Sequence, residues 1–186
     1  NLRLMYAYMF THPGTKLLFM CGEFGQSAEW SHDRSLDWFL LQYSPHQGIL
    51  SLIRDLNHFY KTEPACYQFP FDDRGFEWVD YSDRENSVMV YMRKGEKRED
   101  ALIVVCNFTP EPRQLYRIGV PFRGTYQEVF NSDQLKYGGS GVLNQGLLYT
   151  TPVKYHNRDY SIPLTLPPLA VSVVKLVEEK AEFDLE

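Results

Sequence analysis

The first third of the chain alternates between helical and strand-like hydrophobic patterns. Apolar residues recur at helical spacing over residues 2–9, and this pattern stops at the terminator His12-Pro13-Gly14. Residues 17–20 form a short, continuous apolar run, which favours a strand buried on both faces of a parallel sheet. A second helical stripe covers residues 49–60 and ends before Pro64. The predicted order is therefore helix, buried strand, polar loop and helix.

This first segment, residues 1–64, is predicted to be the closing part of a larger α/β domain. A parallel strand needs neighbouring strands for its backbone hydrogen bonds, and the segment supplies only one strand-helix unit. No capping residue, first-turn proline or initiator methionine precedes the first helix, so we expect the remainder of the domain upstream. The face that packs on that remainder would be an exposed apolar patch, which predicts self-association.

From residue 65 onward the pattern changes to short Val-, Tyr-, Phe- and Ile-rich segments separated by turn residues, as in an antiparallel sandwich. We predict a hairpin loop at residues 83–86 and a long Gly-rich surface loop at 132–157. The fold class is mainly β, with an all-β sandwich of antiparallel, Greek-key type over residues 65–186 after the α/β segment 1–64. The predicted strands cover residues 75–81, 88–93, 102–108, 114–119, 126–131, 160–166 and 171–177.

Composition narrows the classes of function. The formal net charge of −5 and the absence of a basic run argue against a nucleic-acid partner. No stretch reaches the roughly 20 consecutive apolar residues of a membrane span, so no membrane partner is predicted. The three cysteines are widely spaced without a CxxC pair, and the five histidines lack metal-ligand spacing. We predict a cytoplasmic protein with reduced thiols, no metal and no cofactor.

The loop after the predicted buried strand, residues 23–38, holds the densest cluster of sugar-contacting residue types. Loops that follow the strands of a parallel barrel form its functional face, so side chains here lie where ligands bind. Carboxylates bind sugar hydroxyls, and the rings of Phe24, Trp30 and Trp38 can pack on pyranose rings. The alternative is that these aromatic rings pack on neighbouring loops and that Asp33 or Asp37 caps the following turn.

Two catalytic interpretations of the same region are weaker. Glu23 and Glu29 have the residue type of a glycosidase carboxylate pair, but the sequence does not give their separation. Cys21 ends the predicted strand, yet no histidine lies nearby to activate its thiol. We therefore expect no catalytic residue among them.

Several short segments along the chain together resemble those of a known family. The chain is similar to the end of the catalytic barrel and the following domain of bacterial glycogen branching enzymes. No single matching segment is specific to this family, but the order and spacing of the segments together are. The matching segments are Leu17-Leu18-Phe19-Met20, Glu23-Phe24 with Gln26, Glu29-Trp30-Ser31-His32-Asp33, Ser35-Leu36-Asp37-Trp38, Arg54-Asp55-Leu56-Asn57, Gly75-Phe76-Glu77-Trp78, Asn107-Phe108-Thr109-Pro110, Tyr116-Arg117-Ile118-Gly119-Val120-Pro121, Asn131-Ser132-Asp133, Tyr137-Gly138-Gly139-Ser140 and Leu164-Thr165-Leu166-Pro167-Pro168-Leu169.

The resemblance implies a member of the alpha-amylase superfamily. Residues 1–64 would be the last helix-strand-helix portion of a (β/α)8 barrel, and residues 65–186 its all-β C-terminal domain. The family's reaction cleaves an α-1,4 bond in a glucan and transfers the freed segment to a 6-hydroxyl, forming an α-1,6 branch by double displacement with an Asp nucleophile and a Glu acid/base. Those residues lie on barrel strands upstream of this chain, which would be inactive alone.

The resemblance carries over only the loop after the eighth strand and the partners of the intact enzyme. Those partners would be an α-glucan such as glycogen or amylose, and the missing N-terminal barrel. One alternative is a non-catalytic α-glucan-binding β-sandwich with Tyr137, Tyr149 and Tyr155 on its surface; another is the C-terminal part of a related hydrolase, against which the segments 116–121 and 164–169 argue. The expected substrate-binding residues are Glu23, Phe24, Gln26, Glu29, Trp30 and Asp33.

Overall fold

The two long helices form where the sequence pattern places them, although α2 begins at Ser44, before the predicted stripe, and the short helix α3 was not predicted. The computed structural model describes residues 1–180, so the end of the predicted β domain, residues 181–186, lies outside the described residues. The first helix ends because His12 precedes a proline and is extended, and the second ends at Glu63 for the same reason. The helices are α1 (Leu2–Thr11), α2 (Ser44–Thr62) and α3 (Pro64–Tyr67), with 3-10 turns η1 (Gly22–Phe24), η2 (Trp38–Gln42), η3 (Asp73–Gly75), η4 (Arg98–Asp100) and η5 (Leu135–Tyr137).

All seven strands predicted after residue 65 are present, and one further short strand was not expected. The additional strand, β6, lies inside the stretch 132–157 that we predicted to be a loop, and its three residues are too few to show a periodic pattern. The strands are β1 (Phe76–Asp80), β2 (Val88–Arg93), β3 (Leu102–Asn107), β4 (Arg113–Val120), β5 (Gly124–Asn131), β6 (Leu147–Tyr149), β7 (Tyr160–Leu166) and β8 (Ala170–Glu179).

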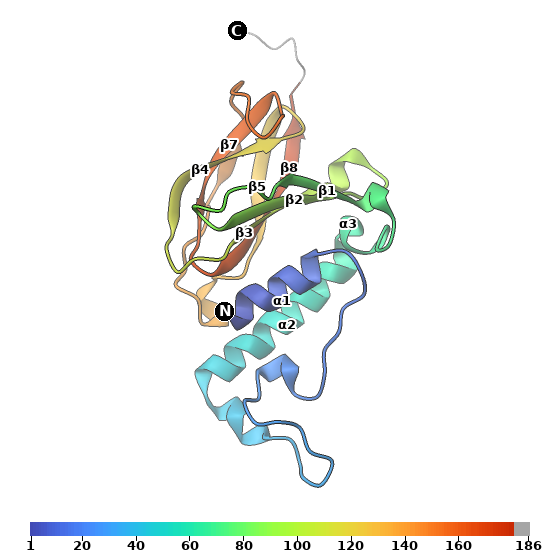
Figure 1. Cartoon of the computed structure of the whole chain (residues 1–186), viewed down its shortest axis with the longest axis vertical. Coiled ribbons are helices and arrows are strands. Elements are labelled where there is room, and N and C mark those ends of the chain that lie inside the picture. Colours follow the sequence, from blue (N-terminus) through green and yellow to red (C-terminus); the bar gives the residue numbers. More distant parts are fainter. Residues whose placement is uncertain (181–186) are drawn as a thin grey trace.

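The strands form two antiparallel sheets that lie above the helices in Figure 1. The larger sheet has the order β1-β2-β3-β8-β5-β6, and the smaller one pairs β4 with β7. Strands β1 and β2 are antiparallel neighbours, as the predicted hairpin requires. Strand β8 pairs with both β3 and β5, so it lies at the centre of the larger sheet. The mainly β, antiparallel prediction is confirmed.

The strand predicted at residues 17–20 does not form in this chain. These residues form irregular coil and the start of a turn, without a ladder partner among the described residues, and Leu17 and Phe19 are 76% and 62% exposed. A parallel strand is stable only beside other strands, and the sheets described above do not extend to this segment. The apolar run was identified correctly, but a run alone does not supply the neighbours that make it a strand.

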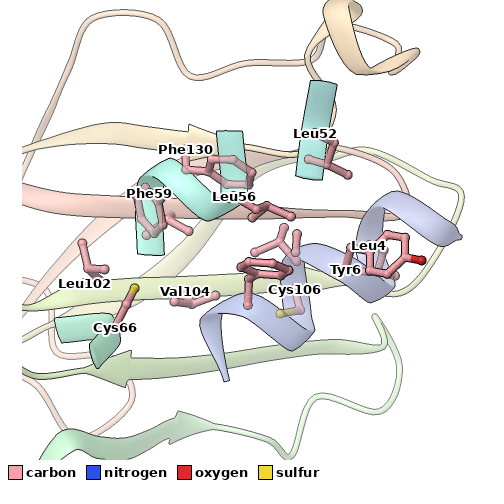
Figure 2. Close-up of a cluster of buried hydrophobic side chains, with 14 of the residues drawn as sticks. Leu4, Tyr6, Leu52, Leu56, Phe59, Cys66, Leu102, Val104, Cys106 and Phe130 are labelled. Atoms are coloured by element: carbon pink, nitrogen blue, oxygen red, sulfur yellow. The ribbon is translucent and has the colours of Figure 1, made fainter. Parts of the chain in front are cut away.

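The centre of the larger sheet is buried on both of its faces. Every residue of β3 is buried, and alternate side chains point to opposite sides, as the strand geometry requires. Leu102, Val104 and Cys106 pack against the helices, in the cluster that Figure 2 shows with residues of α1 and α2. Ile103 and Val105 face the smaller sheet and fill the interior of the sandwich. The molecule therefore has three layers: helices, larger sheet and smaller sheet.

A fully buried arginine joins the helical layer to the sheet. Arg93, at the end of β2, donates three hydrogen bonds to backbone carbonyls: Nε to Gly75 at 3.1 Å, Nη1 to Thr11 at 2.9 Å and Nη2 to Cys66 at 3.3 Å. These carbonyls belong to η3 just before β1, to the end of α1 and to α3. Burial lowers the pKa of Arg93, and the three acceptors offset part of the cost of removing its charge from water.

We predict that Arg93→Met lowers the free energy of unfolding by about 3 kcal/mol, because the buried Thr11 and Cys66 carbonyls lose the arginine as donor and the Gly75 carbonyl keeps only the Lys94 N–H. The matched control is Arg98→Met, since the Arg98 side chain is 65% exposed and its ion pair with Glu179 contributes little. Urea denaturation followed by circular dichroism compares the two variants. Equal denaturation midpoints would show that the three carbonyl bonds contribute nothing net.

The second prediction concerns Lys16, which lies near Arg93. Its pKa is lowered to about 8, first by burial and then by the charge of Arg93. The folded-state pKa therefore lies below the unfolded one, so the charged lysine destabilises the folded chain at neutral pH, and this penalty disappears as pH rises through about 8 to 10.5. We expect Lys16→Met to raise the free energy of unfolding by about 1 kcal/mol at pH 7 and to lose this advantage near pH 10.

The control for Lys16 is Lys154→Met, because the Lys154 side chain is 85% exposed. This second variant should differ little from the unaltered chain at either pH. Urea denaturation of all three proteins at the two pH values gives the measurement. A Lys16→Met variant that is less stable at pH 7 would mean that the bond from Lys16 Nζ to the His12 carbonyl outweighs desolvation.

Candidate functional site

The predicted binding loop is held between the two long helices. The hydroxyl of Tyr6 on α1 donates to the Gly22 carbonyl at 2.7 Å. From α2, His46 Nδ1 lies 2.8 Å from the Phe24 carbonyl oxygen. Both contacts meet the short turn η1, so the base of the loop, residues 21–26, has a defined position relative to α1 and α2.

Two left-handed residues shape this base. Cys21 and Gly25 flank η1 with φ angles of 66° and 67°, which reverses the backbone on each side of the turn. A Cβ at Gly25 would lie 3.1 Å from Leu2 Cδ2, so glycine also allows close packing on α1. The thiol of Cys21 is buried, and burial raises its pKa, followed by the charges of Glu23 and Asp37. This environment opposes the thiolate that a nucleophile needs.

Phe24 is in the protein interior. Its side chain is completely buried, and its ring centroid lies 5.3 Å from that of Trp38, which is half-exposed. The interpretation of Phe24 as a stacking surface for a sugar ring therefore fails for this structure, and the packing alternative applies to this residue. The sequence did not distinguish the two because both require an aromatic side chain.

Gln26 uses its side-chain amide to hold the loop together. The amide oxygen accepts from the Asp37 backbone N–H at 2.8 Å, and the amide nitrogen donates to the Ala28 carbonyl at 3.0 Å. It therefore joins the two ends of the loop tip. Asp37 precedes η2, but its side chain makes no capping hydrogen bond.

The remaining predicted residues stay accessible. Glu29 and Trp30 are exposed, Asp33 has a side chain 79% exposed, and Glu23 is partly exposed at the base. Trp30 packs edge-on to Phe19 with 5.7 Å between ring centroids. This part of the loop thus presents carboxylates and a partly free indole face, which are groups that hydrogen-bond sugar hydroxyls and pack on pyranose rings.

The three tyrosines of the alternative binding surface differ in how far their side chains are exposed. Tyr137 is buried, and its hydroxyl donates to Asp55 Oδ2 at 2.6 Å, so it is not a surface aromatic. Tyr149 is 61% exposed and Tyr155 is 40% exposed. Only these two remain available to a ligand.

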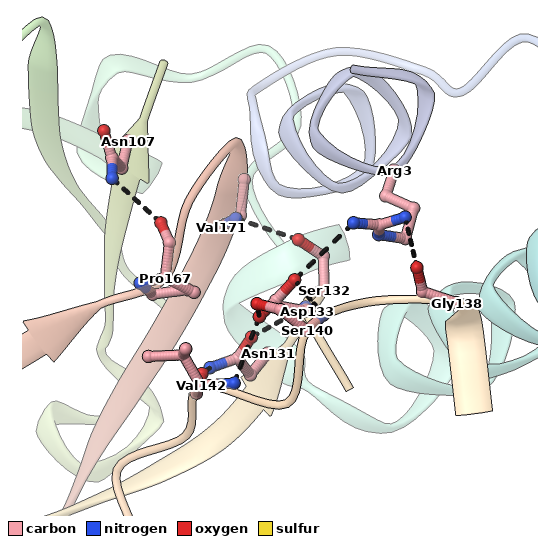
Figure 3. Close-up of polar contacts among 10 residues, drawn as sticks. All are labelled: Arg3, Asn107, Asn131, Ser132, Asp133, Gly138, Ser140, Val142, Pro167 and Val171. Atoms are coloured by element: carbon pink, nitrogen blue, oxygen red, sulfur yellow. Dashed lines mark hydrogen bonds and ion pairs between the residues drawn. The ribbon is translucent and has the colours of Figure 1, made fainter. Parts of the chain in front are cut away.

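The sequence pattern did not predict the polar contacts that join the helices to the sandwich, which Figure 3 shows around Asp133 and Arg3. We call this group the polar junction. The carboxylate of Asp133 is buried and accepts from the Ser140 N–H and hydroxyl at 2.9 and 2.6 Å. Arg3 of α1 lies 3.5 Å from the same carboxylate and donates to the Gly138 carbonyl at 2.8 Å. The available signal was the Asn131-Ser132-Asp133 turn sequence, in which Asn131 Oδ1 accepts from the Asp133 N–H.

A cleft of about 650 Å³ lies beside this junction. Its lining includes Gly25 from the base of the loop, the first turn of α2, and η5 of the β domain. The candidate loop and the β domain therefore share one cleft. Over residues 1–180 the structure gathers no group of three or more histidine, cysteine or acidic side chains that would hold a metal ion. No helix within this range is long and apolar enough to span a membrane.

Comparison with known protein families and curated sequences agrees with this architecture. Residues 78–177 match the family described as alpha amylase, C-terminal all-beta domain. The 1,4-alpha-glucan branching enzyme GlgB of Cellvibrio japonicus is 53% identical over 95% of this chain and 24% of its own length. The enzyme of the same name from Thermosynechococcus vestitus is 49% identical over the whole chain and 25% of its own length. The chain thus spans about a quarter of these relatives.

Two solved structures share the fold at low sequence identity. The alpha-amylase from H. orenii superimposes with a TM-score of 0.56 at 19% identity, over 94% of this chain and 35% of that protein. AmyP, solved in complex with maltose, has a TM-score of 0.61 at 10% identity, over 97% of this chain and 35% of its own. The chain is similar to the C-terminal part of enzymes named 1,4-alpha-glucan branching enzyme GlgB, and it belongs to the alpha-amylase C-terminal all-beta domain family.

Proposed function

We propose that the protein to which this chain belongs transfers α-1,4-glucan segments to 6-hydroxyls and so forms the α-1,6 branches of glycogen. The observation that carries the proposal is an identity of about half over nearly the whole chain with enzymes named for this activity. The three buried, free cysteines are compatible with a reducing cytoplasm, where we place the protein.

Within this function, the accessible loop residues bind the glucan. Glu23, Glu29 and Asp33 accept hydrogen bonds from sugar hydroxyls, and Trp30 packs on a pyranose ring. Gln26 and Phe24 hold the loop in shape. The bond-breaking residues lie upstream of residue 1, in the barrel that residues 1–64 complete, so this chain alone does not branch glucan. Residues 65–186 cover one side of that barrel.

A second candidate function is a glucan-binding surface on the sandwich itself. Tyr149 and Tyr155 support it because both rings are exposed and available for packing on sugar rings. It would operate without the upstream barrel and without any catalytic residue. Retardation of the 186-residue chain during electrophoresis in glycogen gels is its signature.

The first prediction from this proposal concerns branching activity on amylose, followed by iodine staining. We expect the 186-residue chain to leave the absorbance unchanged and a protein extended upstream through the barrel to lower it. In the extended protein, Trp30→Ala should reduce kcat/KM about tenfold, since it removes a packing surface for the substrate. The control Asp159→Ala alters a 75% exposed carboxylate far from the loop and should have no effect.

Three results would contradict parts of this proposal. Branching by the 186-residue chain would place catalytic residues inside it. An inactive extended protein would remove the branching assignment and leave glycogen-gel retardation as the test of the binding module. Equal activity of the Trp30→Ala and Asp159→Ala variants would remove Trp30 from the site.

We also propose that the isolated chain self-associates through its exposed apolar loop. Leu17, Phe19 and Phe39 are each more than half exposed, and large apolar side chains in contact with water favour association. Sedimentation velocity should show oligomers whose proportion rises with concentration, and the double variant Phe19→Ser/Phe39→Ser should be monomeric. The control Leu115→Ser changes an equally exposed leucine of β4 and should still associate. A monomeric unaltered chain at every concentration would refute this proposal.

A further inference from the structure

The turn η5 of the β domain lies directly on the first turns of α2. A Cβ built on Gly48 would lie 2.8 Å from both the carbonyl carbon and the oxygen of Tyr137, closer than side-chain atoms approach a backbone. Gly48 is buried in the helix, where glycine is otherwise unfavourable. The absence of a side chain at this position therefore allows the contact between η5 and the helix.

Two turns further along α2, side-chain hydrogen bonds stabilise the same contact between α2 and η5. The hydroxyl of Tyr137 and the ammonium of Lys136 both bond Asp55 Oδ2, each at 2.6 Å. Asp55 follows Gly48 by seven residues, so the two lie on one face of the helix. The Tyr137 ring is buried and stacks on Phe130 of β5 at 6.3 Å between centroids. Tyr137 thus joins the core of the sheet to α2.

The segment that carries Tyr137 is rigid in itself. Asp133 bonds the Ser140 backbone and hydroxyl, and it also accepts from the Val142 N–H at 3.1 Å. Gly139 passes so close to Asp133 that a Cβ there would lie 2.1 Å from the Asp133 carbonyl oxygen. A turn fixed in this way can transmit its position to the helix it contacts.

The same turns of α2 hold the base of the candidate loop. His46 bonds the Phe24 carbonyl, and Ile49 lies 3.9 Å from the position of a Cβ on Gly25. Gly48, between them, contacts η5. Loop, helix and η5 all line the cleft of about 650 Å³. Residues 46–49 therefore connect the β domain to the base of the loop from the side of α2, while Arg3 and Tyr6 of α1 contact the β domain and the base from the other side.

We infer that Tyr137 is a positioning residue: through Asp55 and Gly48 it sets the first turns of α2, and these set the base of the loop at residues 21–26. This inference deepens the proposed function and rests on it for the ligand, the α-glucan. Small displacements of a substrate-contacting loop weaken binding, so a residue in the β domain contributes to glucan affinity without touching glucan.

The first test is hydrogen exchange of the 186-residue chain, which requires no activity. Tyr137→Phe keeps the ring and removes only the bond to Asp55. The matched control is Tyr116→Phe, which removes a tyrosine-aspartate bond of the same 2.6 Å length to Asp83, within the β domain. We expect Tyr137→Phe to speed exchange of peptides covering residues 19–38 about fivefold, with peptides covering β3 unchanged and Tyr116→Phe without effect on residues 19–38.

Two exchange results would overturn the inference. Faster exchange confined to residues 131–141 would show that the loop does not depend on Tyr137. Equal acceleration of the loop and of β3, or the same loop response to Tyr116→Phe, would show a general loss of stability.

The second test measures branching kinetics in the upstream-extended protein. If the loop is displaced, Tyr137→Phe should raise KM for amylose about threefold with kcat nearly unchanged, because binding contacts are lost equally in ground and transition states. Tyr116→Phe should leave both parameters unchanged. An unchanged KM for Tyr137→Phe would overturn the inference, whereas an inactive unaltered extended protein would refute the proposed function and leave the exchange experiment to decide the role of Tyr137.

Discussion

The structure depends on one constraint: the central strands of the larger sheet are apolar on both faces. β3 is buried along its whole length, so the sheet needs a cover on each side. The smaller sheet covers one face, and α1 and α2 cover the other. Each buried leucine or phenylalanine contributes about 1.5–3 kcal/mol, whereas a surface ion pair such as Arg98–Glu179 contributes at most about 1 kcal/mol. The helical layer is therefore part of the sheet's core, and the division at residue 64 stays a prediction about the longer protein.

Apolar burial brings the layers together, and buried polar groups determine how they align. Arg93 bonds carbonyls from three elements, and Asp133 receives bonds from its own turn while lying beside Arg3 of α1. Each would leave unpaired polar atoms in the interior if the helices shifted by one residue. The base of the candidate loop is bonded to both of these helices, through Tyr6 of α1 and His46 of α2, so its position follows from the alignment.

The candidate loop divides into a base that is packed and a tip that is accessible. Phe24 and Gln26 belong to the packed part, and Trp30 and Asp33 to the accessible part. This division fits a binding role, since accessible groups contact a ligand only as precisely as the buried ones hold them. Several large apolar side chains near the loop, among them Leu17, Phe19 and Phe39, are exposed.

The two long helices, seven of the strands and the family resemblance followed from the sequence pattern, because hydrophobic period and turn residues act locally. That pattern did not determine that residues 17–20 remain unpaired, that Phe24 and Tyr137 are buried, or that Asp133 joins two layers. Those outcomes depend on which surface arrives from elsewhere in the chain: Phe24 meets Trp38, Tyr137 meets Asp55, and Asp133 meets Arg3. An aromatic or acidic residue has the same local pattern whether it packs or binds, so only the tertiary contacts decide its role.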